Sequence, residues 1–225
     1  MSLLEVFRSC DTAKPIRLAA SVRPRYAEAM AFPQEFFSRH GLVYLNRSRV
    51  ADSRVKDYDW SQSPYYDLNR QEFEALTARY GADLRAGRVA SVEIRDAGAL
   101  GWGLFSLAPL DEGDLVGEYA GVIQENSDAS PEEQIDGHYL SDYAWNYPDE
   151  LPDGTEFEVN AFREGNELRF ANHSSRPNMA VDHTVVDGLF VTFFRVILPV
   201  PAGGQLTVDY GREYWEGGFR TRQEL

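Results

Sequence analysis

One polar segment of the chain groups side chains that could recognise a flat heterocycle. It begins at Arg169, continues through Asn172 and His173, and ends at Asn178. Asn and His side chains offer paired hydrogen-bond donors and acceptors, which suit the edge of a ring such as adenine. The same residue types also form Asx-type turns and hydrogen-bonded core histidines. Taken alone, the segment therefore favours a structural role.

Two other segments place glycines beside an aromatic side chain. The first is Leu100-Gly101-Trp102-Gly103, where the glycines allow a ligand to approach the backbone and the indole offers a flat apolar surface. The second ends in Tyr210, which follows an apolar run and would hold its hydroxyl at a strand end. Taken alone, these segments favour a hairpin turn with a core Trp and an ordinary edge tyrosine.

The order and spacing of these motifs resemble the SET-domain family of protein lysine methyltransferases. Gly-Trp-Gly, Glu-Tyr-x-Gly, Arg-Phe-x-Asn-His-Ser-x-x-Pro-Asn and Leu-Thr-x-Asp-Tyr-Gly follow one another between about residues 89 and 216. Four motifs in family order are hard to obtain by chance. The resemblance implies a mainly β (α+β) fold of short β-sheets with a knot-like threading near the C-terminus.

The resemblance further implies a pocket for S-adenosyl-L-methionine. Within it, Asn172 and His173 would read the adenine edge, and the Gly-Trp-Gly turn would cradle the methionine part. The positions that match cofactor-binding residues of the family are Leu100, Gly101, Trp102, Tyr139, Arg169, Asn172 and His173.

The same resemblance implies a narrow channel for the target lysine. Tyr210 matches the catalytic tyrosine and Tyr119 a tyrosine of the channel, and we also assign Ser141, Val208 and Tyr214 to the channel. Many family members have an aromatic residue at the position of Val208. A smaller side chain there favours transfer of more than one methyl group.

The chain departs from the family pattern in its cysteines. Ser175 stands where many members have Cys, and no cysteine cluster follows Gly211. We therefore expect a variant without the zinc-binding cysteine-rich segment that follows the SET domain, and we propose no metal site. Without that segment, Tyr214 or Trp215 is expected to close over the cofactor or the channel.

Charge is distributed unevenly along the chain. The net charge is −14, but residues 1–90 carry +3 and residues 91–225 carry −17. Residues 125–167 hold 13 acidic side chains and one basic side chain. Such a surface repels phosphate, so we expect neither direct nucleic-acid binding by the catalytic domain nor membrane binding. The acidic run is either a solvated loop or a rim that steers a basic substrate, such as a histone tail, towards the channel.

Local patterns predict where helices and strands lie. We expect helices at Pro33–Gly41 and Asn69–Gly81 with a loop at Arg47–Tyr66 between them. The expected strands are Val89–Ile94, Leu104–Leu107, Leu115–Ile123, Phe157–Val159, Leu189–Leu198 and Leu206–Val208. The chain thus divides into a small helical module of unknown role (1–88), a catalytic SET domain (89–216) and a C-terminal tail (217–225).

These observations lead to one functional hypothesis and its alternatives. The hypothesis is an S-adenosylmethionine-dependent lysine methyltransferase acting on a basic protein, with histone as the first candidate. A SET-fold module that binds basic tails without turnover and a methyltransferase for a non-histone protein stay open. A single cysteine, no signal peptide and no long apolar run predict a soluble protein of a reducing compartment, the cytoplasm or nucleus, with export to a host cell left open.

Overall fold

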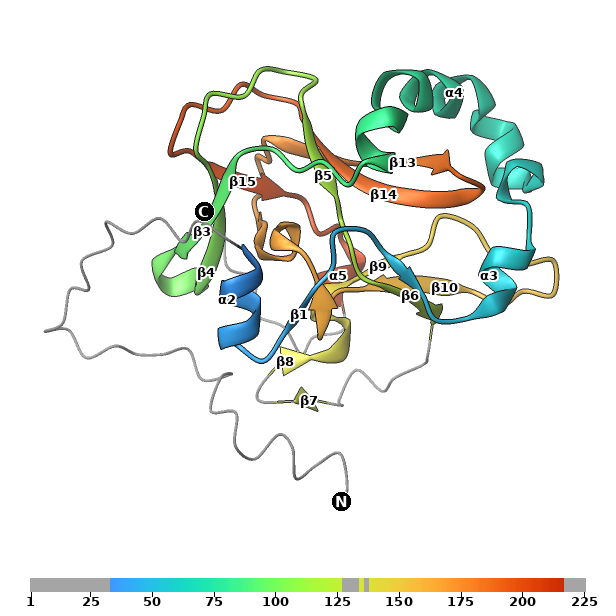
Figure 1. The fold of residues 1–225 in the computed structure, drawn as a ribbon, viewed down its shortest axis with the longest axis horizontal. Helices are drawn as coiled ribbons and strands as arrows, with labels where there is room; N and C mark the ends of the chain where they lie inside the picture. Colours follow the sequence, from blue (N-terminus) through green and yellow to red (C-terminus); the bar gives the residue numbers. More distant parts are fainter. Residues whose placement is uncertain (1–32, 127–133, 136–137, 217–225) are drawn as a thin grey trace, which may run out of the picture.

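Several short β-sheets surround one aromatic core, with helices on the N-terminal side of the chain (Figure 1). The computed structural model describes residues 33–126, 134–135 and 138–216, so the predicted tail at 217–225 and residues 1–32 lie outside it. The helices are α2 (Pro33–Arg39), α3 (Ser53–Asp57), α4 (Pro64–Arg85) and α5 (Glu213–Glu216). The 3-10 helices are η1 (Trp60–Gln62), η2 (Gly98–Leu100), η3 (Leu140–Tyr143) and η4 (Glu167–Phe170). The expected mainly β, α+β fold preceded by helices is confirmed.

The strands form three larger sheets and two short pairs. One sheet has the order β2 (Arg49–Val50), β6 (Val122–Glu125), β10 (Phe157–Asn160), β9 (Ala144–Asn146). The second has the order β12 (Asn172–His173), β15 (Gln205–Val208), β4 (Trp102–Ser106), β3 (Val92–Asp96). The third has the order β13 (Met179–Val186), β14 (Leu189–Val196), β5 (Leu115–Glu118). The pairs are β1 (Val43–Tyr44) with β11 (Glu164–Gly165), and β7 (Gln134–Ile135) with β8 (His138–Tyr139).

The first predicted helix is confirmed as α2, but the prediction for α4 was wrong at both ends. The helix begins at Pro64, because the Ser63 side chain accepts a hydrogen bond from the Tyr66 amide and Pro suits the first turn. It passes through Gly81 and ends at Arg85, followed by Gly87 at φ 62°. The effective stop is therefore Gly87, whose left-handed conformation favours glycine. None of the described helices is long and apolar enough to cross a membrane.

The loop predicted between the two helices was also wrong. Residues 47–66 contain β2, α3, η1 and the start of α4. The Asp52 and Asp59 side chains cap α3 and η1 by accepting from the amides of Arg54 and Ser61. Short polar segments with such caps lack the apolar periodicity that sequence patterns detect.

Two strand predictions need correction. The apolar run at 115–123 is split into β5 and β6, which belong to different sheets and pair with β14 and β10. The eight-residue strand β13 was not predicted at all. It forms a hairpin with β14 through Asp187 (φ 54°) and Gly188 (φ 82°). An Asp-Gly pair between β-branched runs is a strong hairpin signal that would have revealed it.

The described part of residues 1–88 packs into the same core as the sheets. Trp60 is fully buried, its indole nitrogen donates to the Val55 carbonyl oxygen (2.8 Å), and its ring lies 5.0 Å from that of Tyr147. Helix α4 lies against β13, where the Thr184 hydroxyl donates to the Phe73 carbonyl oxygen (2.9 Å) (Figure 1). The domain boundary at residue 88 stays a prediction, but the helices and the sheets share one hydrophobic cluster.

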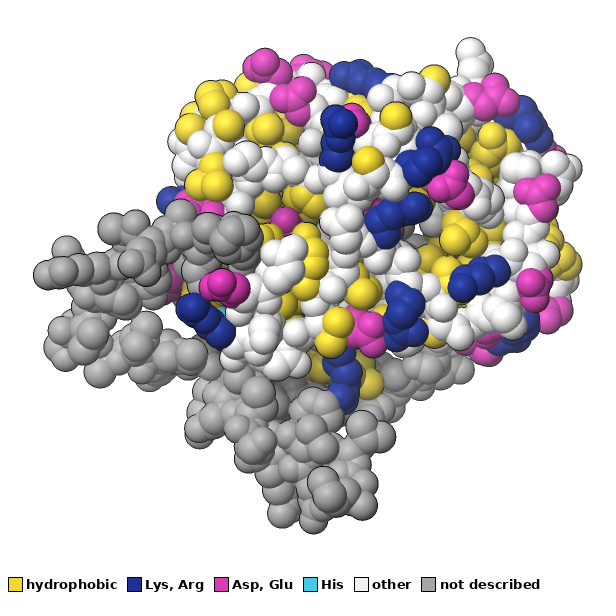
Figure 2. Space-filling view, in the orientation of Figure 1, with side chains coloured by type: hydrophobic (Ala, Val, Ile, Leu, Met, Phe, Trp, Pro, Cys, Tyr) yellow, Lys and Arg dark blue, Asp and Glu magenta, His cyan; other side chains and the backbone are white. Residues whose placement is uncertain are grey.

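The arginines of the N-terminal part are balanced by nearby carboxylates. Figure 2 shows Lys and Arg side chains interspersed with Asp and Glu over one face of the molecule. Arg49 forms a bidentate pair with Glu164 (2.8 and 3.0 Å), and Arg85 pairs with Asp187 (2.8 Å). These pairs are largely exposed and contribute little stability, on the order of 0–1 kcal/mol each. They give the described face a mixed pattern of charge.

Because Trp60 joins the N-terminal helices to the sheets, its loss should destabilise the whole fold. We expect Trp60→Ala to lower the free energy of unfolding by about 3–5 kcal/mol in one cooperative transition. Chemical denaturation followed by circular dichroism measures this. The control Leu68→Ala, at a side chain that is 85% exposed, should change it by less than about 0.5 kcal/mol. A separate early transition that leaves the sheets folded would contradict a shared core.

Candidate active site

Tyr119 lies where the chain crosses from one sheet to another. It follows β5 directly, and β6 begins three residues later at Val122. At Gly121 a Cβ would lie 2.8 Å from the Asn160 backbone, so only glycine allows the two segments to approach this closely. The Tyr119 hydroxyl donates to the Tyr143 carbonyl oxygen (2.8 Å). The Tyr119 side chain is therefore buried at the crossing, and its hydroxyl is held in one direction.

The buried amide of Asn166 fastens this crossing. Its Nδ2 donates to the Glu118 carbonyl oxygen (2.7 Å), and its Oδ1 accepts from the amides of Ala120 (3.4 Å) and Leu168 (3.3 Å). One side chain thus joins the crossing to η4. Asn166 was not predicted as a site residue. Its place in the Gly-Asn pair before the Arg169 segment was the available signal.

Tyr210 is positioned by a parallel pairing between distant segments. Strand β12 pairs with β15, with Asn172 opposite Thr207 and His173 opposite Val208. The Tyr210 amide donates to His173 Nδ1 (3.2 Å), and its hydroxyl donates to the Ala171 carbonyl oxygen (2.8 Å). Burial raises the pKa of Tyr210 well above its ordinary value. The phenol is therefore a neutral donor, not a base.

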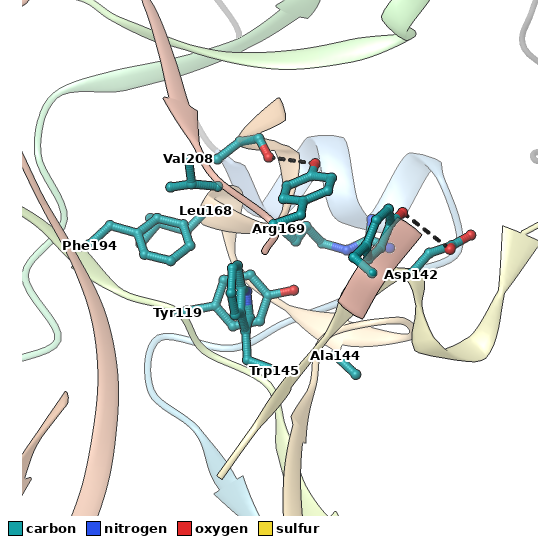
Figure 3. A pocket seen from close by; sticks show the side chains of 11 residues that line it. Tyr119, Asp142, Ala144, Trp145, Leu168, Arg169, Phe194 and Val208 are labelled. Carbon is teal, nitrogen blue, oxygen red and sulfur yellow. Dashed lines mark hydrogen bonds between the residues drawn. The ribbon is translucent and has the colours of Figure 1, made fainter. Parts of the chain in front are cut away.

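Tyr119 and Tyr210 both line one small cavity. Figure 3 shows Phe194 and Val208 at one end and Asp142 at the other. Of the residues predicted from the sequence, the structure brings Tyr119, Arg169, Val208, Tyr210 and Tyr214 together here. The other lining residues were not predicted: Asp142, Ala144, Trp145, Leu168, Ala171 and Phe194. Asp142 and Trp145 lie in the same segment as the predicted Tyr139 and Ser141. The motif therefore identified the right segment, but the side chains that line the cavity are different ones.

Arg169 lies on this cavity with its charge already engaged. It is 8% exposed, and its guanidinium donates to the carbonyl oxygens of Ala161 (2.8 Å) and Phe162 (3.0 Å). The group also lies 3.9 Å from the centre of the Tyr143 ring, a cation–π arrangement. Burial lowers the pKa of Arg169 from its ordinary value. Its role in cofactor binding stays a prediction.

A second group of predicted residues meets beside the first. The Asn172 side chain donates to the Trp102 carbonyl oxygen (3.1 Å), which joins the Asn-His segment to the Gly-Trp-Gly turn. Helix α2 and the residue after it cover this turn, because the rings of Phe36 and His40 lie edge-on to Trp102 at 5.0 and 5.7 Å. The contact between this helix and Trp102 had no signal in the sequence.

The C-terminal helix α5 links the two groups. The Trp215 ring lies 5.0 Å from that of His173 and is stacked on that of Tyr210, at 6.2 Å and an angle of 14°. The Tyr214 hydroxyl donates to Asp142 Oδ1 (3.3 Å). Among the described residues, the buried Trp215 Nε1 has no hydrogen-bond partner. Both aromatic residues thus lie against Tyr210. That either closes over the cofactor or the channel stays a prediction.

The remaining predicted residues lie outside the cavity lining. Leu100 ends η2, and Gly101 follows it at φ 75° with open space around its α-carbon. Tyr139 ends β8, where its amide donates to Asp142 Oδ2 (2.8 Å), and Ser141 lies in η3. Their assigned roles stay predictions. Across the described residues, no group of three His, Cys, Asp or Glu side chains converges in a way that could hold a metal ion.

A family model decides what this arrangement is. The model of the SET domain matches residues 101–211, which include both tyrosines and the Asn-His segment. The chain belongs to the SET-domain family. Members of the SET-domain family use S-adenosylmethionine.

Curated relatives of this SET domain are histone-lysine N-methyltransferases. MEDEA of Arabidopsis thaliana is 34% identical over 127 residues, which are 55% of this chain and 18% of MEDEA. The H3 lysine-9-specific SUVH3 of Arabidopsis thaliana is 28% identical over 152 residues (57% and 23%). SUV39H2 of Gallus gallus is 32% identical over 114 residues (49% and 27%). The chain therefore spans less than a third of the length of each of these relatives.

A solved structure supports the fold of the SET domain over a longer stretch. The crystal structure of ATXR5 in complex with monomethylated histone H3.1 matches with a TM-score of 0.56 at 11% identity. The match covers 81% of this chain and 86% of that one, so it includes part of the chain before residue 101. At this identity the likeness concerns the fold alone.

The raised pKa of the cavity tyrosines makes stability depend on pH. Unfolded Tyr210 loses its proton at about pH 10, while the folded phenol keeps it, so the free energy of unfolding should fall as the pH rises above about 10. We expect this fall to be shallower in Tyr210→Phe, as measured by urea denaturation across that range. A tyrosine that ionises in the folded protein below about pH 9, and is absent from Tyr210→Phe, would contradict a neutral phenol.

Proposed function

We propose that this chain is an S-adenosylmethionine-dependent protein-lysine N-methyltransferase that acts on a basic protein, with histone as the first candidate. The observation that carries the proposal is the cavity between Tyr119 and Tyr210, lined by Trp145 and Phe194 and next to the Asn-His segment. A narrow aromatic cavity suits a long aliphatic side chain with a cationic end. It opens beside residues whose types suit a nucleoside.

The residues around Trp102 and His173 fit the cofactor. Asn172 and His173 supply amide and imidazole groups for an adenine edge, Trp102 and Trp215 supply flat apolar faces, and Gly101 leaves its backbone open. The buried Trp215 Nε1, without a partner among the described residues, is a donor available to a polar ligand atom. When bound, S-adenosylmethionine supplies an electrophilic methyl group on a positively charged sulfur.

The cavity also favours the reactive form of lysine. The amine must be neutral to act as a nucleophile, and its ordinary pKa of about 10.4 makes the neutral form at pH 7 cost roughly 4–5 kcal/mol. Burial among the Tyr119, Trp145 and Phe194 rings disfavours the charged ammonium and lowers this cost. The buried positive charge of Arg169 acts in the same direction.

Tyr210 acts by orientation. Its hydroxyl proton is committed to the Ala171 carbonyl oxygen, and its burial keeps it neutral, so it does not remove the lysine proton. Its hydroxyl oxygen still offers lone pairs towards the cavity. A fixed oxygen and nearby carbonyl groups align donor and acceptor in line, which is a positioning effect.

The nature of the relatives supports a basic protein as substrate. Three relatives are named histone-lysine N-methyltransferases, and the structural neighbour was crystallised with histone H3.1. The acidic composition of residues 125–167 suits a Lys- and Arg-rich segment, whose approach it would accelerate at low salt. A non-histone basic protein fits the same features.

Methyl transfer is the direct test of the proposal. The wild-type protein, incubated with radiolabelled S-adenosylmethionine and core histones, should label a histone band. We expect Tyr210→Phe to lower kcat by about 10²-fold, because loss of one positioned polar group in an active site costs about that much. The matched control Tyr58→Phe removes a hydroxyl outside the cavity and should retain full activity.

The same assay separates the alternatives. Labelling in a total lysate but not in histones would favour a non-histone substrate. If no protein is labelled and isothermal titration detects no S-adenosylmethionine binding, the methyltransferase proposal is wrong. Histone binding without cofactor binding would instead support a binding module.

Trp215 provides a second test, directed at the cofactor. We expect Trp215→Ala to weaken S-adenosylmethionine binding about tenfold or more, since the indole face and its buried donor are both lost. Trp215→Phe, which keeps a ring but not the donor, should show an intermediate loss. Isothermal titration measures both. Unchanged affinity and turnover in Trp215→Ala would exclude this residue from the cofactor site.

A further inference from the structure

We propose that Asp142 receives the protonated lysine at the mouth of the cavity and so acts as a specificity residue for a cationic side chain. This inference rests on the proposed function. It concerns a residue that neither the motifs nor the neighbouring Ser141 had indicated.

The Asp142 carboxylate is held in place from three sides. Its Oδ2 accepts from the Tyr139 amide (2.8 Å) and lies 4.0 Å from His138 Nδ1, and its Oδ1 accepts from the Tyr214 hydroxyl (3.3 Å). The side chain is 15% exposed, so it reaches both the cavity and the solvent. A carboxylate oxygen accepts more than one hydrogen bond, so a carboxylate that is already hydrogen-bonded can also receive an ammonium group.

Charge is arranged along the cavity from one end to the other. Among the described side chains that line it, Asp142 alone is acidic and Arg169 alone is basic. Figure 3 shows Asp142 at one end, Arg169 nearer the middle, and the buried Phe194 and Val208 at the opposite end. A cation entering at the Asp142 end therefore meets its counter-ion first and positive charge afterwards.

This order suits the two forms that lysine must take. At neutral pH lysine arrives as an ammonium ion, and placing that ion in an aromatic cavity without a counter-ion is costly. Asp142 offsets this cost at the mouth. A carboxylate beside the reacting nitrogen would stabilise the ammonium and hinder its deprotonation. Deeper in the cavity the described lining offers aromatic rings and Arg169 instead, so recognition and deprotonation take place at different depths.

The experiment changes the charge at residue 142 and the charge of the peptide side chain independently, and compares the effects on binding. The probes are a single-lysine basic peptide with a histone-tail sequence and the same peptide with norleucine in place of lysine. Equilibrium binding at neutral pH is measured for both peptides. We expect Asp142→Asn to raise Kd for the lysine peptide about tenfold and to leave Kd for the norleucine peptide unchanged. In turnover assays KM should rise with little change in kcat.

Two further variants guard against a merely structural effect. Asp142→Glu keeps the charge and should retain most of the discrimination. Glu74→Gln removes an equal charge from an exposed position on α4, outside the cavity and the acidic run, and should alter neither Kd. Equal weakening of both peptides in Asp142→Asn, or no weakening of either, would overturn the inference. If the wild-type protein binds the lysine peptide through Asp142 but transfers no methyl group, the proposed function fails while this inference stands.

Discussion

The site depends on one constraint, the close crossing of the chain between two sheets at Tyr119–Gly121. The crossing is held because Gly121 lies directly against the Asn160 backbone and because the Asn166 side chain pairs with two backbone groups at the break, the Glu118 carbonyl and the Ala120 amide. A buried amide or carbonyl without a hydrogen-bond partner costs about 1–3 kcal/mol. The Asn166 side chain removes this cost at the break by supplying the partners. Tyr119 lies at the break, so these contacts fix the direction in which its side chain points.

The segment before the SET motifs reinforces the same crossing from outside. The buried Glu118 carboxylate accepts from the Ser48 amide (2.7 Å) and lies 3.5 Å from Arg47 Nε. Burial raises the pKa of Glu118, and the contacts with Ser48 and Arg47 oppose that rise. The segment just before β2 thus provides a hydrogen bond and a positive charge that the SET motifs do not supply. Residues 33–88 are therefore part of what holds the channel tyrosine, in addition to filling the core.

The sequence predicted which segments form the site, but it did not predict which of their side chains line the cavity. Tyr119, Val208, Tyr210 and Tyr214 meet at one cavity because short motifs encode local backbone shape and are brought together by strand pairing. Asp142 escaped prediction because its role depends on which side of η3 faces Tyr214, and no pattern reports this. The start of α4 was predicted too late for a similar reason. Ser63 and Pro64 are typical of loops, and here they form the N-cap and the first residue of the helix.

The helix α5 depends for its position on the rings beside the cavity. A short helix of four residues cannot be stable on its own, since most helical stability comes from packing. Its position is set by Trp215 against His173 and Tyr210, and by Tyr214 against Asp142. Trp215 and Tyr214 therefore both border the site and hold α5 in place. A ligand that contacts Trp215 would therefore stabilise α5 as it binds.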